Sequence, residues 1–365
     1  MKHGYKIFDA NRHVVEPRDL WESRLPEPFK AQVQVGPTPL DMTVKGRPMR
    51  LPRTNYFDHP AYRAAFQHAI DNGFSAEVNL RDMDSENIDA ALLLPTAGLY
   101  AIWADHVDAA LSTAMCRAYN DWLHDYCQAD RKRLKGMALL PLQDPQEAGT
   151  ELRRCVEQLG MVAGYVSSSP LVNRKLHDRV YDPLYRTAEE LHAPLVISQA
   201  GGSVLPQMGQ DRFESYYAQE AVLDPFEAWL AVASLMGHHV LERFPELKIG
   251  FFGAGCGWLP CWLDRLDEHW GGPFGTDAPG AMPPMHLFRT QGFAACDPWE
   301  HTLSDVIEEM GVSCILWGSQ YPMPDLLNFF PGEVTTVAED DRLTDDQKRK
   351  VLWDNAAALF HLNGS

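Results

Sequence analysis

Eight short apolar runs, separated by stretches long enough for a helix, are the feature that most constrains the fold of this chain. They lie at residues 5–10, 88–95, 134–141, 162–168, 193–199, 247–253, 291–297 and 314–320. Between two of them, residues 107–127 place apolar side chains three and four positions apart, which predicts an amphipathic helix. Strand-length runs that alternate with helical stretches indicate βα units around a parallel sheet. Eight such units in 365 residues favour an α/β fold, a distorted (β/α)₈ barrel of the TIM type.

The alternative is an open doubly wound sheet, which usually carries a glycine-rich phosphate loop after its first strand. The segment 9–17, "DANRHVVEP", has no glycine, so the barrel is preferred. Surplus length lies in two insertions, 17–80 and 200–235, and each follows a predicted strand. Because strand C-terminal ends form the mouth of such a barrel, we expect both insertions to cover it as lids. No linker divides the chain, so we predict one domain over 1–365.

The charge and apolar patterns restrict the class of partner. Acidic residues outnumber basic ones by 50 to 32, giving a net charge of −18, which argues against nucleic acid and anionic membranes. No apolar run approaches the roughly 18 residues of a membrane span, and the N-terminus has no signal-peptide pattern, so a cytoplasmic protein is expected. Seven scattered cysteines without a C-x-x-C pair are expected to be reduced core thiols. The predicted partner is a small molecule.

Chemistry in such barrels occurs where the strands end, and His13 follows the first apolar run. Histidine titrates near neutral pH and both donates and accepts protons, so His13 is the first candidate acid or base. It could instead be structural, bound to Glu16 or to a backbone carbonyl. Further strand ends and mouth loops supply candidate substrate-binding residues, although packing or helix-capping roles are open for several of them. These candidates are Glu16, Trp103, His106, Trp258, Cys296 and Tyr321.

Several long segments resemble one known family. Residues 9–26, 181–197, 239–270 and 315–325, the last reading "ILWGSQYPMPD", are similar to the amidohydrolase-related family, in the branch that contains aminocarboxymuconate-semialdehyde decarboxylase. The resemblance covers nearly the whole chain. It implies a distorted (β/α)₈ barrel, frequent homodimers, one divalent metal that is often zinc, and either non-oxidative decarboxylation or hydrolysis.

The positions that the resemblance implies for metal ligands are substituted in this sequence. Asn11 replaces a carboxylate, Gln199 a histidine, Gly253 a histidine or glutamate, and Gln320 an aspartate. Catalytic zinc needs three thiolate, imidazole or carboxylate ligands, and neutral amides do not replace them. We therefore expect no metal. Asn11, Gln199 and Gln320 are predicted to form an amide-lined pocket beside His13, and these four residues are the predicted catalytic set.

Three functions remain open at this point. The first is a metal-independent lyase, cyclase or isomerase that acts on a small carboxylated or aromatic molecule through His13. The second is a metal-dependent decarboxylase or hydrolase, with zinc held by substitute ligands. The third is a catalytically silent binding or scaffold protein, since a fold alone does not guarantee an activity.

Overall fold

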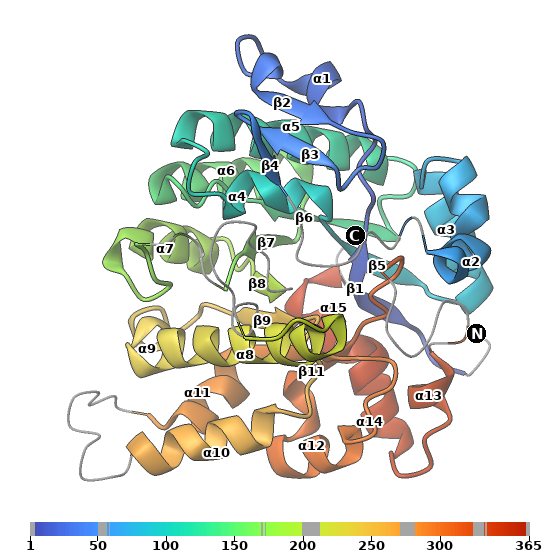
Figure 1. The fold of residues 1–365 in the computed structure, drawn as a ribbon. Helices are drawn as coiled ribbons and strands as arrows, with labels where there is room; N and C mark the ends of the chain where they lie inside the picture. Colours follow the sequence, from blue (N-terminus) through green and yellow to red (C-terminus); the bar gives the residue numbers. More distant parts are fainter. Residues whose placement is uncertain are drawn as a thin grey trace.

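The strands form a single eight-stranded parallel sheet that curls into a nearly closed barrel, as the sequence predicts (Figure 1). The computed structural model describes residues 4–49, 57, 59–168, 171, 173–198, 212–270, 282–323, 332 and 334–362. In spatial order, the strands are β1 (Phe8–His13), β5 (Ala90–Leu94), β6 (Leu134–Leu139), β7 (Ala163–Val166), β8 (Leu195–Ser198), β9 (Ile249–Phe252), β10 (Gly292–Cys296) and β11 (Ile315–Trp317). Each of them overlaps one of the eight apolar runs. The predicted fold class is confirmed.

Two backbone hydrogen bonds join the first strand to the segment that follows the last one. The N–H of His13 donates to the carbonyl of Tyr321 at 2.6 Å, and the N–H of Gln320 donates to the carbonyl of Asn11 at 2.7 Å. The side chain of Asn11 also packs so closely on Gly318 that any Cβ at that glycine would collide with it. The seam of the barrel therefore lies between β1 and β11.

Helices surround the strands in Figure 1. The predicted helix at 107–127 is α5 (Ala109–Cys127), which Asp108 caps by accepting the N–H of Leu111 at 2.9 Å. The other helices between strands are α2 (Pro60–Asp71), α3 (Ala76–Glu86), α6 (Pro145–Leu159), α7 (Asp182–Glu190), α8 (Tyr216–Gly237), α9 (Val240–Arg243), α10 (Leu259–Trp270), α11 (Pro284–Gln291) and α12 (Leu303–Met310). The chain ends in α13 (Thr335–Ala338), α14 (Asp345–Arg349) and α15 (Asn355–Leu359), and α1 (Leu20–Arg24) and α4 (Tyr100–Trp103) are short.

The first insertion contains a small antiparallel sheet of β2 (Val33–Val35), β3 (Met42–Val44) and β4 (Arg47–Met49). This sheet lies against α4, where the hydroxyl of Tyr100 donates to the carbonyl of Leu40 at 3.2 Å. In the second insertion, residues 199–211 lie outside the described part of the chain. Residues 216–237 form α8, and its Glu227 accepts the hydroxyl of Ser168, which follows β7. The role of these insertions as lids stays a prediction.

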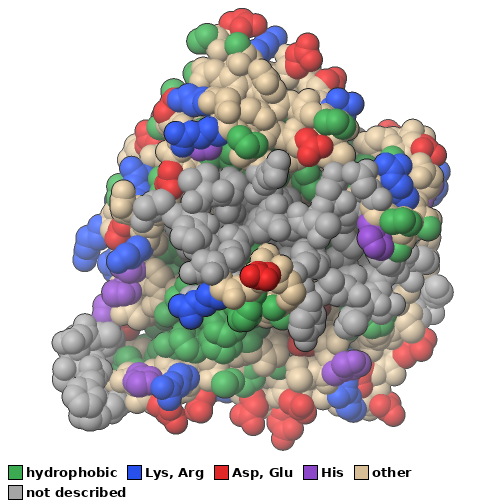
Figure 2. Space-filling view, viewed as in Figure 1, with side chains coloured by type: hydrophobic (Ala, Val, Ile, Leu, Met, Phe, Trp, Pro, Cys, Tyr) green, Lys and Arg blue, Asp and Glu red, His purple; other side chains and the backbone are tan. Residues whose placement is uncertain are grey.

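Helix α8 carries apolar side chains on both of its faces. Leu223, Ala231 and Leu235 are buried, whereas Phe226 and Leu230 are among the most exposed large apolar side chains. Figure 2 shows apolar side chains gathered over this helix. No helix among the described residues has the length and apolar character needed to cross a bilayer. The predicted homodimer stays a prediction.

All seven cysteines are free, and six of them are buried, as expected for core thiols. Cys261, on α10, is the exposed exception.

Candidate active site

The closed seam brings three of the four predicted catalytic residues to the same end of the barrel. Asn11 and His13 end β1, and Gln320 follows β11. Asn11 and His13 are each 1% exposed, and Gln320 is partly buried. The fourth residue, Gln199, lies outside the described residues, directly after the end of β8.

The imidazole of His13 is oriented by a backbone carbonyl. Its Nδ1 lies 2.9 Å from the carbonyl oxygen of Pro95, which follows β5. Because a carbonyl only accepts hydrogen bonds, Nδ1 must carry a proton, and in the neutral ring the lone pair is then on Nε2. The fixed nitrogen sets the ring orientation, and the other nitrogen is the one that can exchange a proton. His13 thus has a structural contact of the kind that the sequence left open, and its proton-transfer role stays a prediction.

Asn11 and Ser198 are buried, and their polar side-chain atoms have no hydrogen-bond partner among the described residues. Both amide atoms of Asn11 and the hydroxyl of Ser198, at the end of β8, have no partner in the described part of the protein. An unsatisfied buried polar group costs about 1–3 kcal/mol. Native proteins rarely leave such groups unpaired, so these atoms are candidates for hydrogen bonds with a polar ligand.

A buried ion pair supports the seam from the side of α3. The guanidinium of Arg12 donates to Asn79 at 2.6 Å, lies 3.4 Å from Asp9, and stacks on the ring of Tyr321 at 3.6 Å. Asp9 also accepts the backbone N–H of Ser319 at 2.9 Å. Arg12 and Asp9 are both fully buried, so this pair fixes β1 against the loop after β11.

Gln320 holds a carboxylate that the predicted site did not include. Its Nε2 donates to Asp297 Oδ1 at 2.7 Å, and Asp297 is the first residue after β10. Gln320 has a φ of 59°, in the left-handed region that few non-glycine residues adopt. The position of Asp297 at the end of the predicted strand 291–297 was the available sequence signal. The contact between Asp297 and Gln320 cannot be predicted from their spacing in the sequence.

Glu16, predicted to bind substrate, is instead a structural anchor. Its carboxylate is 2% exposed and accepts the backbone N–H groups of Thr96, Ala97 and Gly98 at 2.9–3.0 Å. These donors form the turn after β5, and they occupy both carboxylate oxygens. The structure thus gives Glu16 a structural role, and its predicted contact with substrate stays a prediction.

Replacing Glu16 with alanine should destabilise the fold by roughly 2–4 kcal/mol, because three buried donors lose their acceptor. Chemical denaturation measures this, with the exposed Glu22→Ala as control. Burial raises the pKa of Glu16, although the backbone bonds lower it. Its titration therefore contributes stability that is fully present below the unfolded pKa of about 4.3 and is lost as the pH rises through the raised folded value. Glu16→Gln should flatten this pH dependence, and an unchanged profile would contradict it.

Two further candidates have structural partners. The hydroxyl of Tyr321 donates to Asp82 of α3, and its ring packs edge-on against Phe66. His106 binds the carbonyl of Val44 at 3.2 Å through Nε2, and burial lowers its pKa. Tyr321 thus anchors the seam loop and His106 the small sheet, and substrate binding by either one stays a prediction.

The next two candidates, Trp258 and Cys296, are packed against other protein groups. Trp258 packs at 6.3 Å between ring centroids on Phe251, which stacks on Phe288 of α11, so Trp258 lies between sheet and helices. Cys296 is fully buried, and burial raises the pKa of its thiol well above the usual value. Their predicted roles in substrate binding stay predictions. The side chain of Trp103 lies outside the described residues.

The donors at the mouth do not make a metal site in the described part of the chain. Within that part, no group of three or more His, Cys, Asp or Glu residues is placed to hold a metal ion. His13 and the orphaned oxygen of Asn11 could each offer one ligand atom, and Asp297 is bonded to Gln320. Protein zinc and manganese sites combine several imidazole and carboxylate donors, and one imidazole with neutral amides does not fit that requirement.

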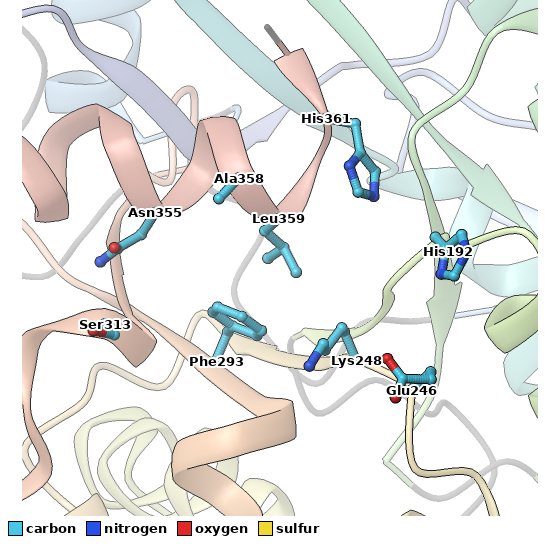
Figure 3. Close-up of a pocket in the computed structure, with 9 residues that line it drawn as sticks. All are labelled: His192, Glu246, Lys248, Phe293, Ser313, Asn355, Ala358, Leu359 and His361. Atoms are coloured by element: carbon cyan, nitrogen blue, oxygen red, sulfur yellow. The ribbon is translucent and has the colours of Figure 1, made fainter.

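A separate cavity of about 420 Å³ opens at the opposite end of the barrel (Figure 3). Its lining comes from segments that precede strands, from the start of β10, and from α15 and the residues after it. Phe293 and Leu359 lie at its centre, and His192 and His361 at one side. Lys248, at its rim, donates to the carbonyl of Thr290 at 2.8 Å. Because the catalytic face of a barrel is the C-terminal one, this cavity is not part of the candidate active site.

The eight-stranded parallel barrel is of the TIM type. A family described as Amidohydrolase matches residues 47–362. The chain belongs to this amidohydrolase family.

Curated relatives include a 2-amino-3-carboxymuconate-6-semialdehyde decarboxylase of Dictyostelium discoideum, 24% identical over 82% of this chain and 80% of that protein. A gamma-resorcylate decarboxylase of Polaromonas is 28% identical over 78% of this chain and 86% of that protein. These names agree with the branch that the sequence resembles.

Solved structures show the same fold. An amidohydrolase of Mycobacterium avium subsp. paratuberculosis has a TM-score of 0.78 at 21% identity, covering 98% of this chain and 99% of that one. A dihydroxybenzoic acid decarboxylase of Polaromonas, with bound manganese and the inhibitor 2-nitroresorcinol, has a TM-score of 0.70 at 21% identity, covering 99% and 98%. At sequence identities this low, the similarity supports the fold but not the roles of individual site residues.

Proposed function

We propose that this chain is a lyase that removes CO₂ without oxidation from a small aromatic or unsaturated carboxylate, with His13 as an acid and base. The observation that supports the proposal is the 2.9 Å contact between His13 Nδ1 and the carbonyl of Pro95, because it makes Nε2 the basic nitrogen of a neutral imidazole at the end of β1. Proton transfer by a positioned histidine typically accelerates such reactions by about 10²–10⁴-fold.

The relatives support the reaction class. The Dictyostelium and Polaromonas proteins are named as decarboxylases, and the Polaromonas structure holds a nitroresorcinol inhibitor. The orphaned amide of Asn11 and hydroxyl of Ser198 both donate and accept hydrogen bonds. They suit the hydroxyl and carboxylate oxygens of a molecule of that kind. A cyclase or isomerase would use the same histidine, but no named relative favours it.

A second candidate, metal-dependent decarboxylation, is favoured by the manganese in the Polaromonas structure. If a dication were bound here, His13 and Asn11 would be its nearest donors, and it would polarise substrate oxygens. The described donors do not fit that ion. We therefore propose that side chains of this protein carry out the proton transfer without a metal ion.

We expect purified protein to release CO₂ from at least one member of a panel of hydroxybenzoates, including 2,6-dihydroxybenzoate, which a related crystal structure contains. Turnover should persist after chelation, and elemental analysis should find far less than one metal ion per chain. About one tightly bound manganese or zinc per chain, lost together with activity, would favour the second candidate. No CO₂ from any carboxylate would contradict the proposal and favour a silent binding protein.

A further inference from the structure

The cavity at the N-terminal end of the barrel combines an apolar centre with a polar rim (Figure 3). Its volume of about 420 Å³ lies within the roughly 300–1,000 Å³ that is typical of small-molecule sites. The ring of Phe293, at the start of β10, and the side chain of Leu359, on α15, form the centre. An apolar body of about one ring can be buried against them, and such burial favours binding.

Lys248 supplies the cation of the rim. Its ammonium donates to the carbonyl of Thr290 at 2.8 Å, which uses one of its three N–H groups. Glu246 lines the same cavity, but no carboxylate of the described residues forms an ion pair with Lys248. The remaining N–H groups can therefore make charge-assisted hydrogen bonds to the carboxylate of a ligand.

Two histidines complete the rim, and they come from helix ends far apart in the sequence. His192 follows α7 and His361 follows α15, and their rings lie edge to face with centroids 6.4 Å apart. Both residues have a positive φ, 49° and 53°, in the left-handed region where helices commonly end in glycine. Neither imidazole has a hydrogen-bond partner in the described part of the chain. Side chains at positions that suit glycine store local strain, which is concentrated at functional sites.

The chain is also irregular where it enters α15 beside the cavity. Residues Lys350–Asp354 form a π-helix, a rare conformation that is frequent at functional sites. The next residue, Asn355, lines the cavity, and its side-chain amide donates to the carbonyls of Val312 and Ile315 at 2.8 and 2.7 Å. These bonds hold this wall in place, so the cavity is preformed, as ligand sites usually are.

We propose that this cavity binds a small carboxylate with an apolar body, at a site separate from the barrel mouth. The carboxylate accepts hydrogen bonds from Lys248 and from the imidazole N–H groups of His192 and His361. The apolar body contacts Phe293 and Leu359. A metal ion does not suit these donors, because no group of three His, Cys, Asp or Glu residues is placed to hold one within the described ranges. Binding here does not depend on the proposed decarboxylation.

Benzoate, benzamide and benzylammonium share one ring and differ in charge, so they test this class of ligand. Calorimetric titration of the full chain should give a Kd below about 1 mM for benzoate, binding at least about 10-fold weaker for benzamide, and none for benzylammonium. Absence of benzoate binding, or equal binding of benzylammonium, would overturn the proposal.

Imidazole resonances in NMR spectra show where benzoate binds. Those of His192 and His361 should shift on titration, and Ala358→Trp, at an exposed cavity-lining position of α15, should abolish the shifts. Ala64→Trp, at an exposed position of α2, is the control and should leave them intact. Shifts confined to His13 would place benzoate at the mouth alone, against the proposal.

Two substitutions at the rim should have opposite effects on benzoate affinity. Lys248→Met should weaken binding by about 10–100-fold, because a hydrogen bond between charged groups is lost. Glu246→Gln should strengthen it by about 2–5-fold, because an exposed carboxylate no longer repels the anion. Unchanged affinity in Lys248→Met, or weaker binding in Glu246→Gln, would contradict an anionic ligand.

His361→Gly separates binding from folding. Glycine adopts a positive φ without strain, so the denaturation midpoint should stay the same or rise, while benzoate affinity falls by about 3–10-fold with the lost donor. Asn87→Gly, at the left-handed end of α3, is the matched control and should keep the wild-type affinity. Wild-type affinity in His361→Gly would overturn the assignment of this rim.

Discussion

Replacing His13 with glutamine should lower kcat by about 10²–10⁴-fold, the largest effect on activity that we expect from one substitution. Glutamine keeps an N–H that can donate to the carbonyl of Pro95, so the backbone contact at 2.9 Å has a substitute. It has no titratable nitrogen, so proton transfer at the mouth is lost. Initial rates of CO₂ release as a function of substrate concentration give kcat and KM separately.

His124→Gln is a matched control for this experiment. The Nδ1 of His124 also lies 2.9 Å from a backbone carbonyl, that of Leu159, but on the outer helix α5. It should leave both kinetic constants unchanged. Turnover by His13→Gln at the wild-type rate would remove His13 from the mechanism, and equal losses in the two variants would point to a general effect on folding.

The largest effect on stability is expected at Arg12. Replacing it with methionine leaves the fully buried carboxylate of Asp9 without its cation and should cost about 3–5 kcal/mol of unfolding free energy. The exposed pair Arg24–Asp125, at 2.8 Å, gives a contrast, because Arg24→Met should cost less than about 1 kcal/mol. The midpoint of chemical denaturation, with the slope held in common, measures both.

The double variant Asp9→Asn with Arg12→Met keeps this prediction testable if the single variant does not fold. Neutralising Asp9 removes the unpaired buried charge, so the double variant should be more stable than Arg12→Met alone. A double variant that is less stable, with effects that simply add, would show that the pair does not act through its charges.

The fold could be predicted from the sequence because buried parallel strands appear as continuous apolar runs. Few known architectures contain eight such strands that alternate with helices. The end of β1 was harder to predict from the sequence. The apolar run ends at residue 10, but the strand continues through Asn11, Arg12 and His13. These polar residues are buried in a strand because Asp9, Asn79 and the seam loop satisfy some of their groups, and a register shift interrupts the ladder there. Partners more than 60 residues away in the chain are not visible in local pattern.

Site residues on strands were easier to predict than site residues on loops. His13, Asn11 and Gln320 reach one end of the barrel because strand direction determines where each strand ends. Glu16, His106 and Trp258 lie near strand ends as well, but a loop turns its side chains toward whichever partner tertiary packing provides. Asp297 was not among the predicted site residues, although it follows a strand. Its contact with Gln320, which the sequence does not reveal, is what makes it a candidate.

The seam between β1 and β11 also determines when the site can form during synthesis. Asp9 and Ser319, which bond across it, are separated by 310 positions. At ribosomal speeds of about 5–20 residues per second, the first strand waits roughly 15–60 s for its neighbour. Until then, Asp9 lacks the donors of Ser319, so this side of the mouth forms late in synthesis.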